Sequence, residues 1–532
     1  MIMTGYFGLV LHGHIPWCKK SGRWPAGEEW IFEAMYETYI PMLNVLREFH
    51  NIGINPAITI NITPILAEQL ADEYMKQRFS EYMENLISRA KNDILRFENH
   101  QNRKKIAEFH LSNFEYILNT FYNNYYRDIL GSFKWFQDEG MIELITCGAT
   151  HGFLPLFEND SAVFSQIQLA VDTHKKYFTK PPKGIWLPEC AYRPKEYKEG
   201  RVRESIDYWL NNSDIEYFFV DSHGILTSEL VEKNNEIGLT TNFGYNLESR
   251  VSVFGRNTNT SKQVWDAKIG YPGNEFYREF HKKDHTSGLH YWRITEKKRG
   301  KEEKQLYDID RANNIVKSHS DHFVSLIKEE LNQFSNNFNK EGIIILPTDF
   351  ELYGHWWVEG VDWVKRIIEI IFIDSNIEMI SISDYISKFK EKFSVIRMKK
   401  SSWGEGGDFR VWKNPEHGWI WPYINGSIKE FEDVLKLIPH PNEWERRILN
   451  QIARELLLME GSDWPFLLYT KQAKEYANQR FHLHHQRFLK LLWAAKNCND
   501  RNRISLRELE EMESIDSCFH DINIDYFKKR KI

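Results

Sequence analysis

Short apolar runs recur along the chain, each ends in a polar or glycine-containing turn, and helical patterns separate most of them. Two examples are YFGLVLHGH at 6–14 and GIIILPTDFELYG at 342–354; the others lie at 56–64, 141–152, 184–189, 215–224 and 377–385. Nearly continuous apolar strands that alternate with helices are typical of a parallel sheet covered on both faces. Seven such runs predict an α/β fold with a closed or nearly closed barrel, whose chemistry lies at the carboxyl ends of the strands.

Two segments interrupt this alternation. Residues 65–138 contain helix-period patterns rich in Lys, Glu, Asn and aromatic residues, too long for one crossover helix. From about Ser401 the chain is first rich in Trp and Gly and then strongly helical. We therefore predict a catalytic barrel at 1–398 with a helical insertion at 65–138, and a C-terminal helical domain at 399–532 that contributes aromatic residues to the site.

Charge and cysteine content limit the class of protein. The 532 residues carry a formal net charge of −6 without long blocks of one sign, which argues against nucleic acid or an acidic membrane as a partner. The five cysteines form neither a disulfide framework nor a zinc knuckle, and the N-terminal apolar run lacks the marks of a signal peptide. No run reaches the roughly 20 apolar residues of a membrane-spanning helix. These features predict a soluble cytoplasmic protein.

Aromatic residues are abundant. They make up 14 % of the chain, with 18 Trp and 25 Tyr, which is typical of proteins that stack sugar rings, although a Trp-rich core would explain the same composition. The segment SSWGEGGDFRVWKNPEHGWIW places Trp403 and Trp412 among glycines and favours a loop with stacking platforms. Trp265 is a similar candidate. Trp30 lies in a helical pattern, where core packing is an equal explanation.

Histidines follow two of the predicted strands. His12 and His14 lie two positions apart at a strand end, so they point to the same face, and His151 ends another strand. The pair could bind a metal ion, could donate hydrogen bonds to substrate hydroxyls, or could be satisfied core histidines. The sequence leaves these three interpretations open.

Carboxylates follow two further strands. Glu189, in GIWLPECAYRP, stands in a proline-fixed turn whose apolar walls are Trp186 and Tyr192; it could be a nucleophile or acid, or the partner of a nearby basic residue. Asp349 and Glu351, in TDFELYGHWW, come just before His355 and two tryptophans. Two carboxylates from different strand ends on an aromatic floor fit glycosidic-bond chemistry, where one acts as nucleophile or base and the other as acid.

These motifs resemble a known family. HGHIPW, GATHGFLP, GIWLPECAYRP, TDFELYGHWW and SSWGEGGDFRVW, in this order and spacing, resemble the five sequence regions of glycoside hydrolase family 57. VWDAKIGYPGNEFYREF, the length and the helical C-terminus are similar to its 1,4-α-glucan branching enzyme subgroup. The resemblance covers nearly the whole chain and is weakest at 65–138, 225–262 and after about 500.

The resemblance implies a distorted, TIM-like (β/α)7 barrel that acts on α-1,4-glucan by a retaining double displacement, without metal or other cofactor. It implies Glu189 as nucleophile and Asp349 as general acid/base, with transfer of the cleaved chain to a 6-hydroxyl to form an α-1,6 branch. The implied partner is an α-glucan such as amylose, amylopectin or glycogen. The residues expected to bind it are His12, His14, Trp30, His151, Trp186, Tyr245, Trp265, His355, Trp403, Trp412 and Asp463.

Alternatives remain open at this point. A 4-α-glucanotransferase or α-amylase of the same family differs only in its product. Branching members have a mobile loop with a tyrosine over the acceptor region; here that loop lies within 225–262, and Tyr245 or Phe243 could occupy the place. A zinc-dependent mannosidase or deacetylase on a similar barrel would use His12 and His14 as ligands. A catalytically silent glucan-binding protein is the remaining alternative. Transferred chain length and oligomeric state are beyond the sequence.

Overall fold

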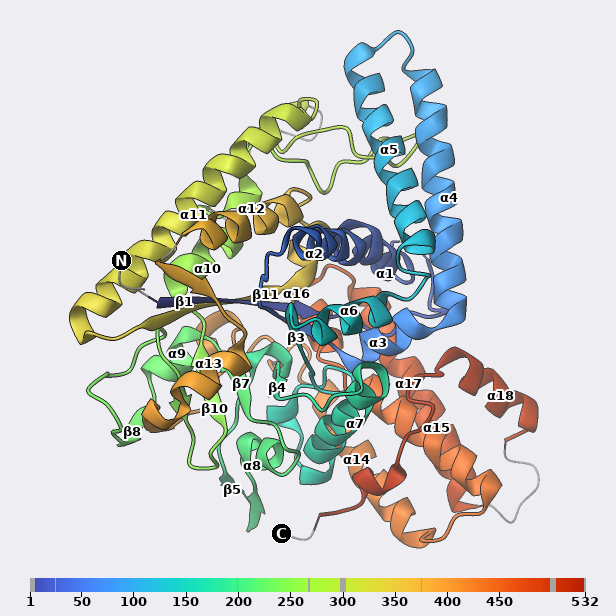
Figure 1. Cartoon of the computed structure of the whole chain (residues 1–532). Coiled ribbons are helices and arrows are strands. Elements are labelled where there is room, and N and C mark those ends of the chain that lie inside the picture. Colours follow the sequence, from blue (N-terminus) through green and yellow to red (C-terminus); the bar gives the residue numbers. More distant parts are fainter. Residues whose placement is uncertain are drawn as a thin grey trace.

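The computed structural model describes residues 5–530 except 24, 199, 267, 297–302, 375 and 498–503. Seven parallel strands of this part of the chain follow one another around a barrel (Figure 1). They are β1 (Gly5–Gly13), β2 (Ile58–Ile62), β3 (Ile142–Ile145), β4 (Gly184–Ile185), β7 (Tyr217–Val220), β10 (Ser252–Gly255) and β11 (Gly342–Asp349). The prediction of an α/β barrel is confirmed.

The barrel consists of two well-paired arcs, which a few backbone contacts join on each side. One arc has the order β11-β1-β2-β3 and the other contains β4-β7-β10. An isolated parallel bridge between Thr146 and Ile185 joins β3 to β4. On the other side, the backbone N–H of Asn257, just after β10, donates to the carbonyl of Ile345 in β11 at 3.3 Å. This uneven pairing makes the barrel a distorted one.

One of the seven predicted strands is not a stave of the barrel. The run at 377–385 forms only the short strand β12 (Ile377–Met379), which pairs with Gly5–Phe7 at the beginning of β1, before β2 joins β1 at Val10. Helix α13 (Ile382–Phe389) begins directly afterwards, with the side chain of Ser381 as its cap. The barrel strand that the apolar runs did not include is β10, which is only four residues long and follows a polar turn.

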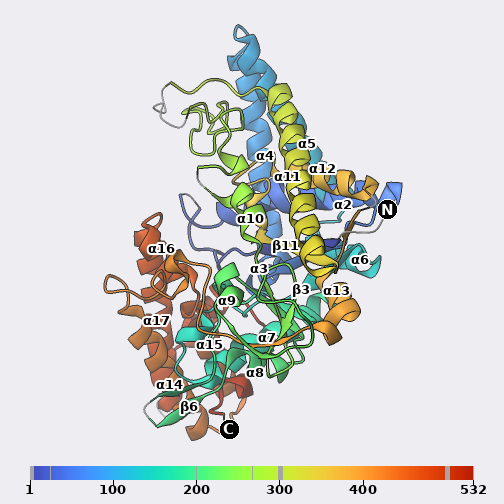
Figure 2. The same ribbon diagram turned by 90° about the vertical axis from the view of Figure 1, so that its left-hand side faces the viewer.

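Helices cover the outside of the barrel. Those that follow the barrel strands include α2 (Ile40–Ile52), α7 (Asp160–Phe178), α8 (Ile206–Asn211), α9 (Ser222–Leu226), α10 (Thr258–Trp265), α11 (Ile309–Phe338) and α12 (Gly360–Ile373). Four helices lie between β2 and β3: α3 (Pro64–Ala71), α4 (Glu73–Arg96), α5 (Gln101–Asn123) and α6 (Ile129–Asp138). Helices α4 and α5 pack as a hairpin that projects from the molecule (Figures 1 and 2). Their sequence explains the pairing, because Phe79, Met83, Leu86 and Ala90 form one buried stripe on α4.

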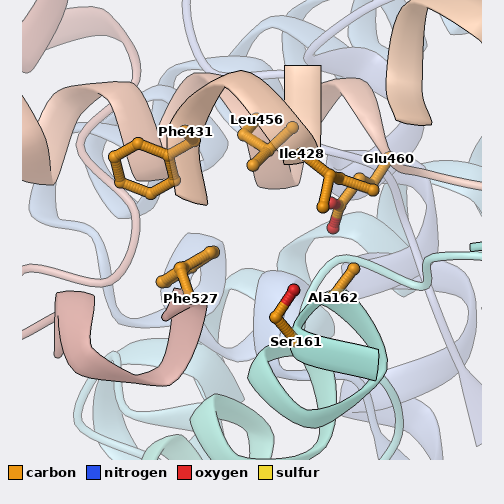
Figure 3. A pocket seen from close by; sticks show the side chains of 7 residues that line it. All are labelled: Ser161, Ala162, Ile428, Phe431, Leu456, Glu460 and Phe527. Carbon is orange, nitrogen blue, oxygen red and sulfur yellow. The ribbon is translucent and has the colours of Figure 1, made fainter. Parts of the chain in front are cut away.

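The C-terminal helices pack against the barrel at the end away from the α4–α5 tip (Figures 1 and 2). They are α14 (Ile420–Leu437), α15 (Glu443–Met459), α16 (Asp463–Thr470), α17 (Lys474–Lys496) and α18 (Leu506–Ile515). Figure 3 shows a small pocket at this contact, where Ser161 and Ala162 of α7 face Ile428, Phe431, Leu456, Glu460 and Phe527. The Glu460 carboxylate accepts a hydrogen bond from Gln166 of α7 at 2.7 Å.

The connection between α15 and α16 reaches the barrel rim. Gly461 forms an antiparallel bridge with Gly152, and the backbone N–H of Ser462 donates to the carbonyl of His151 at 3.0 Å. Thr150 donates from its hydroxyl to the carbonyl of Leu457 at 2.5 Å. These bonds fix Ser462 and Asp463 beside the carboxyl ends of the strands.

Two expectations from composition can be compared with the described residues. Their four cysteines, Cys18, Cys147, Cys190 and Cys518, are buried and unpaired; Cys498 lies outside the described residues. In the same part of the chain, no helix has the length and apolar character needed to cross a membrane.

Candidate active site

The candidate residues of the barrel gather at the carboxyl ends of its strands. His12 near the end of β1 is paired in register with Asp349, the last residue of β11. His151 follows β3 and Glu189 follows β4, the two strands that the Thr146–Ile185 bridge joins. Carboxyl ends of parallel strands meet at one rim, so four residues distant in sequence face a common site.

Glu189 occupies a strained turn. It lies in the short helical turn η3 (Pro188–Cys190), with φ +60° at Glu189 and +47° at Cys190. A left-handed conformation at consecutive non-glycine residues is costly and is characteristic of functional sites. The carboxylate is held at both oxygens: Nε1–H of Trp403 donates to Oε2 at 2.8 Å, and Oγ of Ser462 lies 2.8 Å from Oε1. Burial raises the pKa of Glu189, while these two contacts lower it.

Asp349 has a different environment. Burial, followed by the negative charges of Glu351 and Glu189, raises its pKa to about 8. Glu351 is itself engaged: it accepts from the backbone N–H of His14 at 3.0 Å and from the hydroxyl of Tyr39. The site therefore contains one carboxyl group that keeps its proton at neutral pH and another whose oxygens are oriented by donors.

Four flat side chains stack along the rim between these carboxyl groups. The ring of His12 lies parallel to Trp186 at 4.5 Å and to His151 at 5.0 Å, and His151 stacks on His14 at 4.0 Å. Nε2 of His14 lies 3.1 Å from both oxygens of Asp463 at the start of α16. Burial opposes protonation of His14, but Asp463 raises its pKa above the usual value. The stack consists of three imidazoles and one indole, and His14 is the imidazole that takes up a proton most readily, because the pKa values of His12 and His151 are lowered by burial.

A π-helical turn supports the far side of the site. Residues Met35–Tyr39 form η1, between α1 (Glu29–Ala34) and α2. Within it, Oε2 of Glu37 lies 2.7 Å from Nδ1 of His355, and Oε1 accepts a hydrogen bond from Nη2 of Arg278 at 2.6 Å. Burial raises the pKa of Glu37, but Arg278 and His355 outweigh it and lower the pKa to about 2. π-helical turns occur frequently at functional sites, because the additional residue redirects the side chains.

Exposed tryptophans mark the entrance. Trp265 at the end of α10 is 47 % exposed, Trp356 is 46 % exposed, and their ring centroids lie 6.2 Å apart. An open pocket beside them is lined by Val264, Trp265, Asp266, Pro272, Gly273 and Leu352. Two accessible indole faces next to a depression form a surface on which sugar rings can stack.

Two groups of potential metal ligands occur at this rim: His12, Cys147 and His151, and His14, His151 and Asp463. Their ring nitrogens already have protein partners, since those of His12 and His151 form one chain of hydrogen bonds and His14 Nε2 contacts Asp463. A third group, on the C-terminal helices, is accompanied by two arginines. The donor sets fit hydrogen bonding better than zinc coordination, and we derive no step through a metal.

Comparison with known proteins identifies the family. Residues 8–398 match the family model described as glycosyl hydrolase family 57, and residues 424–527 match the model of the 1,4-alpha-glucan branching enzyme C-terminal region. The chain belongs to glycosyl hydrolase family 57. The resemblance drawn from the five motifs is thereby confirmed.

The chain is similar to proteins of two activities. It is 40 % identical to a 1,4-alpha-glucan branching enzyme of Thermococcus kodakarensis, over 98 % of this chain and 78 % of the relative. The crystal structure of a family 57 branching enzyme from that organism matches with a TM-score of 0.93 and 39 % identity, covering 99 % of this chain and 97 % of the other. An α-amylase of Thermotoga maritima matches with a TM-score of 0.87 and 31 % identity, over 99 % and 100 % of the two chains.

The structure brings most, but not all, of the expected family 57 residues together. His12, His14, His151, Trp186, Glu189, Asp349, Trp403 and Asp463 meet at the rim, with His355 and Trp265 on its margins. Trp412 is 1 % exposed and stacks on Phe153 at 4.6 Å, behind the site. Trp30 is half-buried and contacts Tyr476 edge-on at 5.3 Å.

The loop tyrosine is also away from the rim. Tyr245 lies in β9 (Tyr245–Asn246), is 1 % exposed, and donates from its hydroxyl to the carbonyl of Gly238 at 2.7 Å. Phe243, the other candidate, is buried in a cluster with Phe334 and Phe393. Neither side chain covers the candidate site in this arrangement.

Three contributors were missed from the sequence. Ser462 stands in an ordinary polar stretch, GSDW, and no pattern marks it. Tyr39, the last residue of the π-helical turn, donates to Glu351, and sequence periodicity does not reveal such a turn. Asn61 could have been predicted, because it lies near the end of β2 at the position that is paired in register with His12 of β1.

Proposed function

We propose that this chain is a 1,4-α-glucan branching enzyme that acts by retaining double displacement, with Glu189 as nucleophile and Asp349 as general acid/base. The observation that carries the proposal is the contrast between the two carboxyl groups. Asp349 has a pKa of about 8, and both oxygens of Glu189 are held by donors. An acid that is protonated at neutral pH beside an oriented carboxylate is what the first step requires.

In the first step Asp349 donates its proton to the glycosidic oxygen as an oxygen of Glu189 bonds to the anomeric carbon. The bond between that carbon and the leaving oxygen breaks, and the leaving chain departs with a 4-hydroxyl group. Asp349 becomes a carboxylate and Glu189 becomes a neutral glycosyl ester. The loss of the negative charge on Glu189 lowers the pKa of Asp349, which prepares it to act as a base.

In the second step the 6-hydroxyl of another glucan chain loses its proton to Asp349 while its oxygen attacks the anomeric carbon. Glu189 leaves as a carboxylate, and the product contains an α-1,6 branch. Water in place of the acceptor gives hydrolysis. We further propose that Trp265 and Trp356 stack glucose units at the entrance, while His14, His355 and Asp463 bind hydroxyls of the donor chain.

An α-amylase is the second candidate. The match to the Thermotoga maritima α-amylase at 31 % identity supports it, and so does the distance of Tyr245 and Phe243 from the rim. If no other side chain covers the acceptor region, water competes with the sugar acceptor and hydrolysis rises relative to transfer.

The deciding experiment is incubation with amylose, followed by proton NMR of α-1,6 linkages and a count of reducing ends. We expect new α-1,6 signal with few new reducing ends, loss of both in Glu189→Gln and Asp349→Asn, and no change in Glu216→Gln, an exposed carboxylate before β7. Many reducing ends without α-1,6 signal would identify an amylase. Unchanged products in both active-site variants would contradict these catalytic roles.

We also propose that no metal or other cofactor takes part and that the enzyme works in a reducing compartment, as in the cytoplasm. The hydrogen-bonded state of the rim histidines and the unpaired cysteines of the described chain support this. Activity that disappears with a strong chelator and returns with zinc would contradict the first part.

A further inference from the structure

A chain of hydrogen bonds runs from Glu189 into the barrel wall. Oγ of Ser462 lies 2.8 Å from Oε1 of Glu189 and 2.7 Å from Nδ1 of His151. Nε2 of His151 lies 3.1 Å from Nε2 of His12, and Nδ1 of His12 lies 2.6 Å from Oδ1 of Asn61. All five side chains are buried. Each contact between buried polar atoms therefore needs one donor and one acceptor.

Asn61 fixes the direction of this chain. Its Nδ2 donates to the carbonyl of Ile145 at 3.2 Å, so Oδ1 faces His12 and must accept a hydrogen bond. Nδ1 of His12 therefore carries a proton. Burial and the nearby charge of His14 hold the pKa of His12 well below its usual value, so the ring is neutral and its Nε2 is an acceptor. It follows that Nε2 of His151 carries a proton and donates to His12.

The remaining contacts allow two arrangements with the same number of protons. If His151 is neutral, its Nδ1 accepts from the hydroxyl of Ser462, and Ser462 can then only accept from a protonated Glu189. If Glu189 is a carboxylate, Ser462 donates to it and must accept from Nδ1 of His151, which is then an imidazolium. Among the residues that the structure describes, Ser462 is the hydrogen-bonded link between Glu189 and His151 through which one arrangement becomes the other.

We propose that Ser462 is a positioning residue that passes the proton of Glu189 to His151 and then holds the carboxylate for attack; this rests on the proposed nucleophilic role of Glu189. In the transfer the O–H bond of Glu189 breaks and a new O–H bond forms at Ser462. The original hydroxyl proton of Ser462 moves to Nδ1 of His151. The site gains or loses no net charge, so the nucleophile is prepared without exchange with solvent.

Other charged groups bias this equilibrium. Cationic His14, which stacks on His151 and pairs with Asp463, disfavours a second cation at His151. The carboxylate form of Glu189 favours that cation, since Oε1 lies 3.8 Å from Nδ1 of His151. Asp349 and the thiol of Cys147 also face the cluster, and both stay neutral because burial raises their pKa values. Burial, followed by the charges of His14 and His12, holds the pKa of His151 well below its usual value, so the arrangement with neutral His151 is favoured at rest and the imidazolium forms only when Glu189 gives up its proton.

The test compares Ser462→Ala, Ser462→Thr and a matched control, Ser427→Ala, which removes a buried hydroxyl from α14 outside the site. We expect Ser462→Ala to lose roughly 10- to 100-fold in kcat with little change in KM. Its acid limb of kcat/KM should move to higher pH, because the hydroxyl contact that lowers the pKa of Glu189 is gone. Ser462→Thr keeps the hydroxyl and should stay within a fewfold of wild type, and the control should match wild type.

A glycosyl fluoride donor separates this step from acid catalysis, because fluoride leaves without protonation. Asp349→Asn should recover glycosyl-enzyme formation with this donor, whereas Ser462→Ala and Glu189→Gln should stay impaired. Wild-type kcat and an unmoved acid limb in Ser462→Ala, or equal losses in a folded Ser462→Thr, would overturn the proposal for Ser462. An active Glu189→Gln would instead overturn the proposed nucleophile.

Discussion

Asp349 and Glu189 carry the same chemical group and have opposite tasks in the proposed reaction. The surroundings of each group explain the difference. Burial raises the pKa of Asp349 most, and the negative charges of Glu351 and Glu189 raise it further. Burial also raises the pKa of Glu189, but an indole N–H and a hydroxyl contact its oxygens and lower it again in part. The division of roles is therefore a property of the surroundings of each carboxyl group.

Replacement of Glu351 tests this account of Asp349. Because the pKa of Asp349 is about 8, the acid is lost as pH rises through this value, and kcat/KM should fall on the alkaline side. Glu351→Gln removes a negative charge, so the proton leaves Asp349 more easily and the alkaline limb should move to lower pH. We expect a loss of roughly two- to tenfold in kcat/KM at pH 8 and a smaller loss at pH 6. A pH profile for both proteins measures it.

The control for this variant is Glu369→Gln on the outer helix α12, which should keep the wild-type profile. An alkaline limb that does not move in Glu351→Gln would mean that burial alone sets the proton affinity of Asp349. Movement to higher pH would contradict the charge argument itself.

The catalytic candidates could be predicted from sequence because each follows an apolar run, and barrel chemistry lies at strand ends. Glu189 and Asp349 are both examples. Ser462 could not be predicted, because its role depends on where a helix 273 residues further along the chain meets the barrel. The burial of Tyr245 and Trp412 could not be predicted either. The sequence of a loop does not show whether an aromatic side chain points into the core or toward the site.

The π-helical turn η1 and the turn after β11 depend on each other. Gly354 has φ +109°, and a Cβ atom at this position would lie 1.9 Å from the carbonyl oxygen of Glu37. The close backbone contact allows Glu37 to meet His355 while Tyr39 meets Glu351. Two elements far apart in sequence thus support the same margin of the site.

Gly354→Ala should disturb both elements. The methyl group meets backbone and the φ value is unfavourable for alanine, so we expect a loss of about 2–4 kcal/mol in the free energy of unfolding. Activity should fall as well, because the displaced turn carries His355 and follows Asp349. Chemical denaturation and kcat/KM measure the two effects.

The matched control is Gly238→Ala, where no atom lies within 4 Å of the added methyl group. It should retain wild-type stability and activity. If the two alanine variants behave alike, the contact between Gly354 and Glu37 contributes nothing to the site.

Strand prediction succeeded where an apolar run stood out from its neighbours, whatever its length, since β7 has four residues and β4 only two. The eight residues of β11 are nearly all buried and form an obvious run. The four residues of β10 are equally buried, but Val253 and Phe254 are the only large apolar residues among them, and polar segments lie on both sides. The run at 377–385 is divided between β12 and α13, because Ser381 caps a helix after only three strand residues. Local sequence carries neither the pairing partner nor the cap.

The C-terminal helices and the barrel share both a core and a site. Trp403 and Ser462, both beyond residue 398, contact the proposed nucleophile Glu189, and Glu460 and Leu457 are bonded to residues of the barrel. Loss of packing in these helices should therefore reach Glu189. The division into a barrel at 1–398 and helices at 399–532 remains a prediction. The boundary at residue 398 separates Glu189 from Trp403 and Ser462, although all three lie in one site.

Leu456→Ala tests whether the molecule unfolds as one unit. Leu456 is 1 % exposed on α15 and faces α7 (Figure 3), so we expect a loss of about 2–5 kcal/mol. Calorimetry should show a single transition at lower temperature, and activity should disappear with it. Leu437→Ala, at a position 70 % exposed on α14, is the control and should melt like wild type. Two separate transitions, with the barrel at its original temperature, would contradict this coupling.

The separation of Glu189 from Ser462 has a consequence during synthesis. Ribosomes add about 5–20 residues per second, so the 273 residues between them take roughly 14–55 s to appear. Trp403 follows Glu189 by 214 residues, so its indole appears roughly 11–43 s after Glu189 and still before the hydroxyl of Ser462. A growing chain that already contains Glu189 therefore lacks the two groups that orient this carboxylate, and we expect full activity only after Trp403 and Ser462 have packed against the barrel.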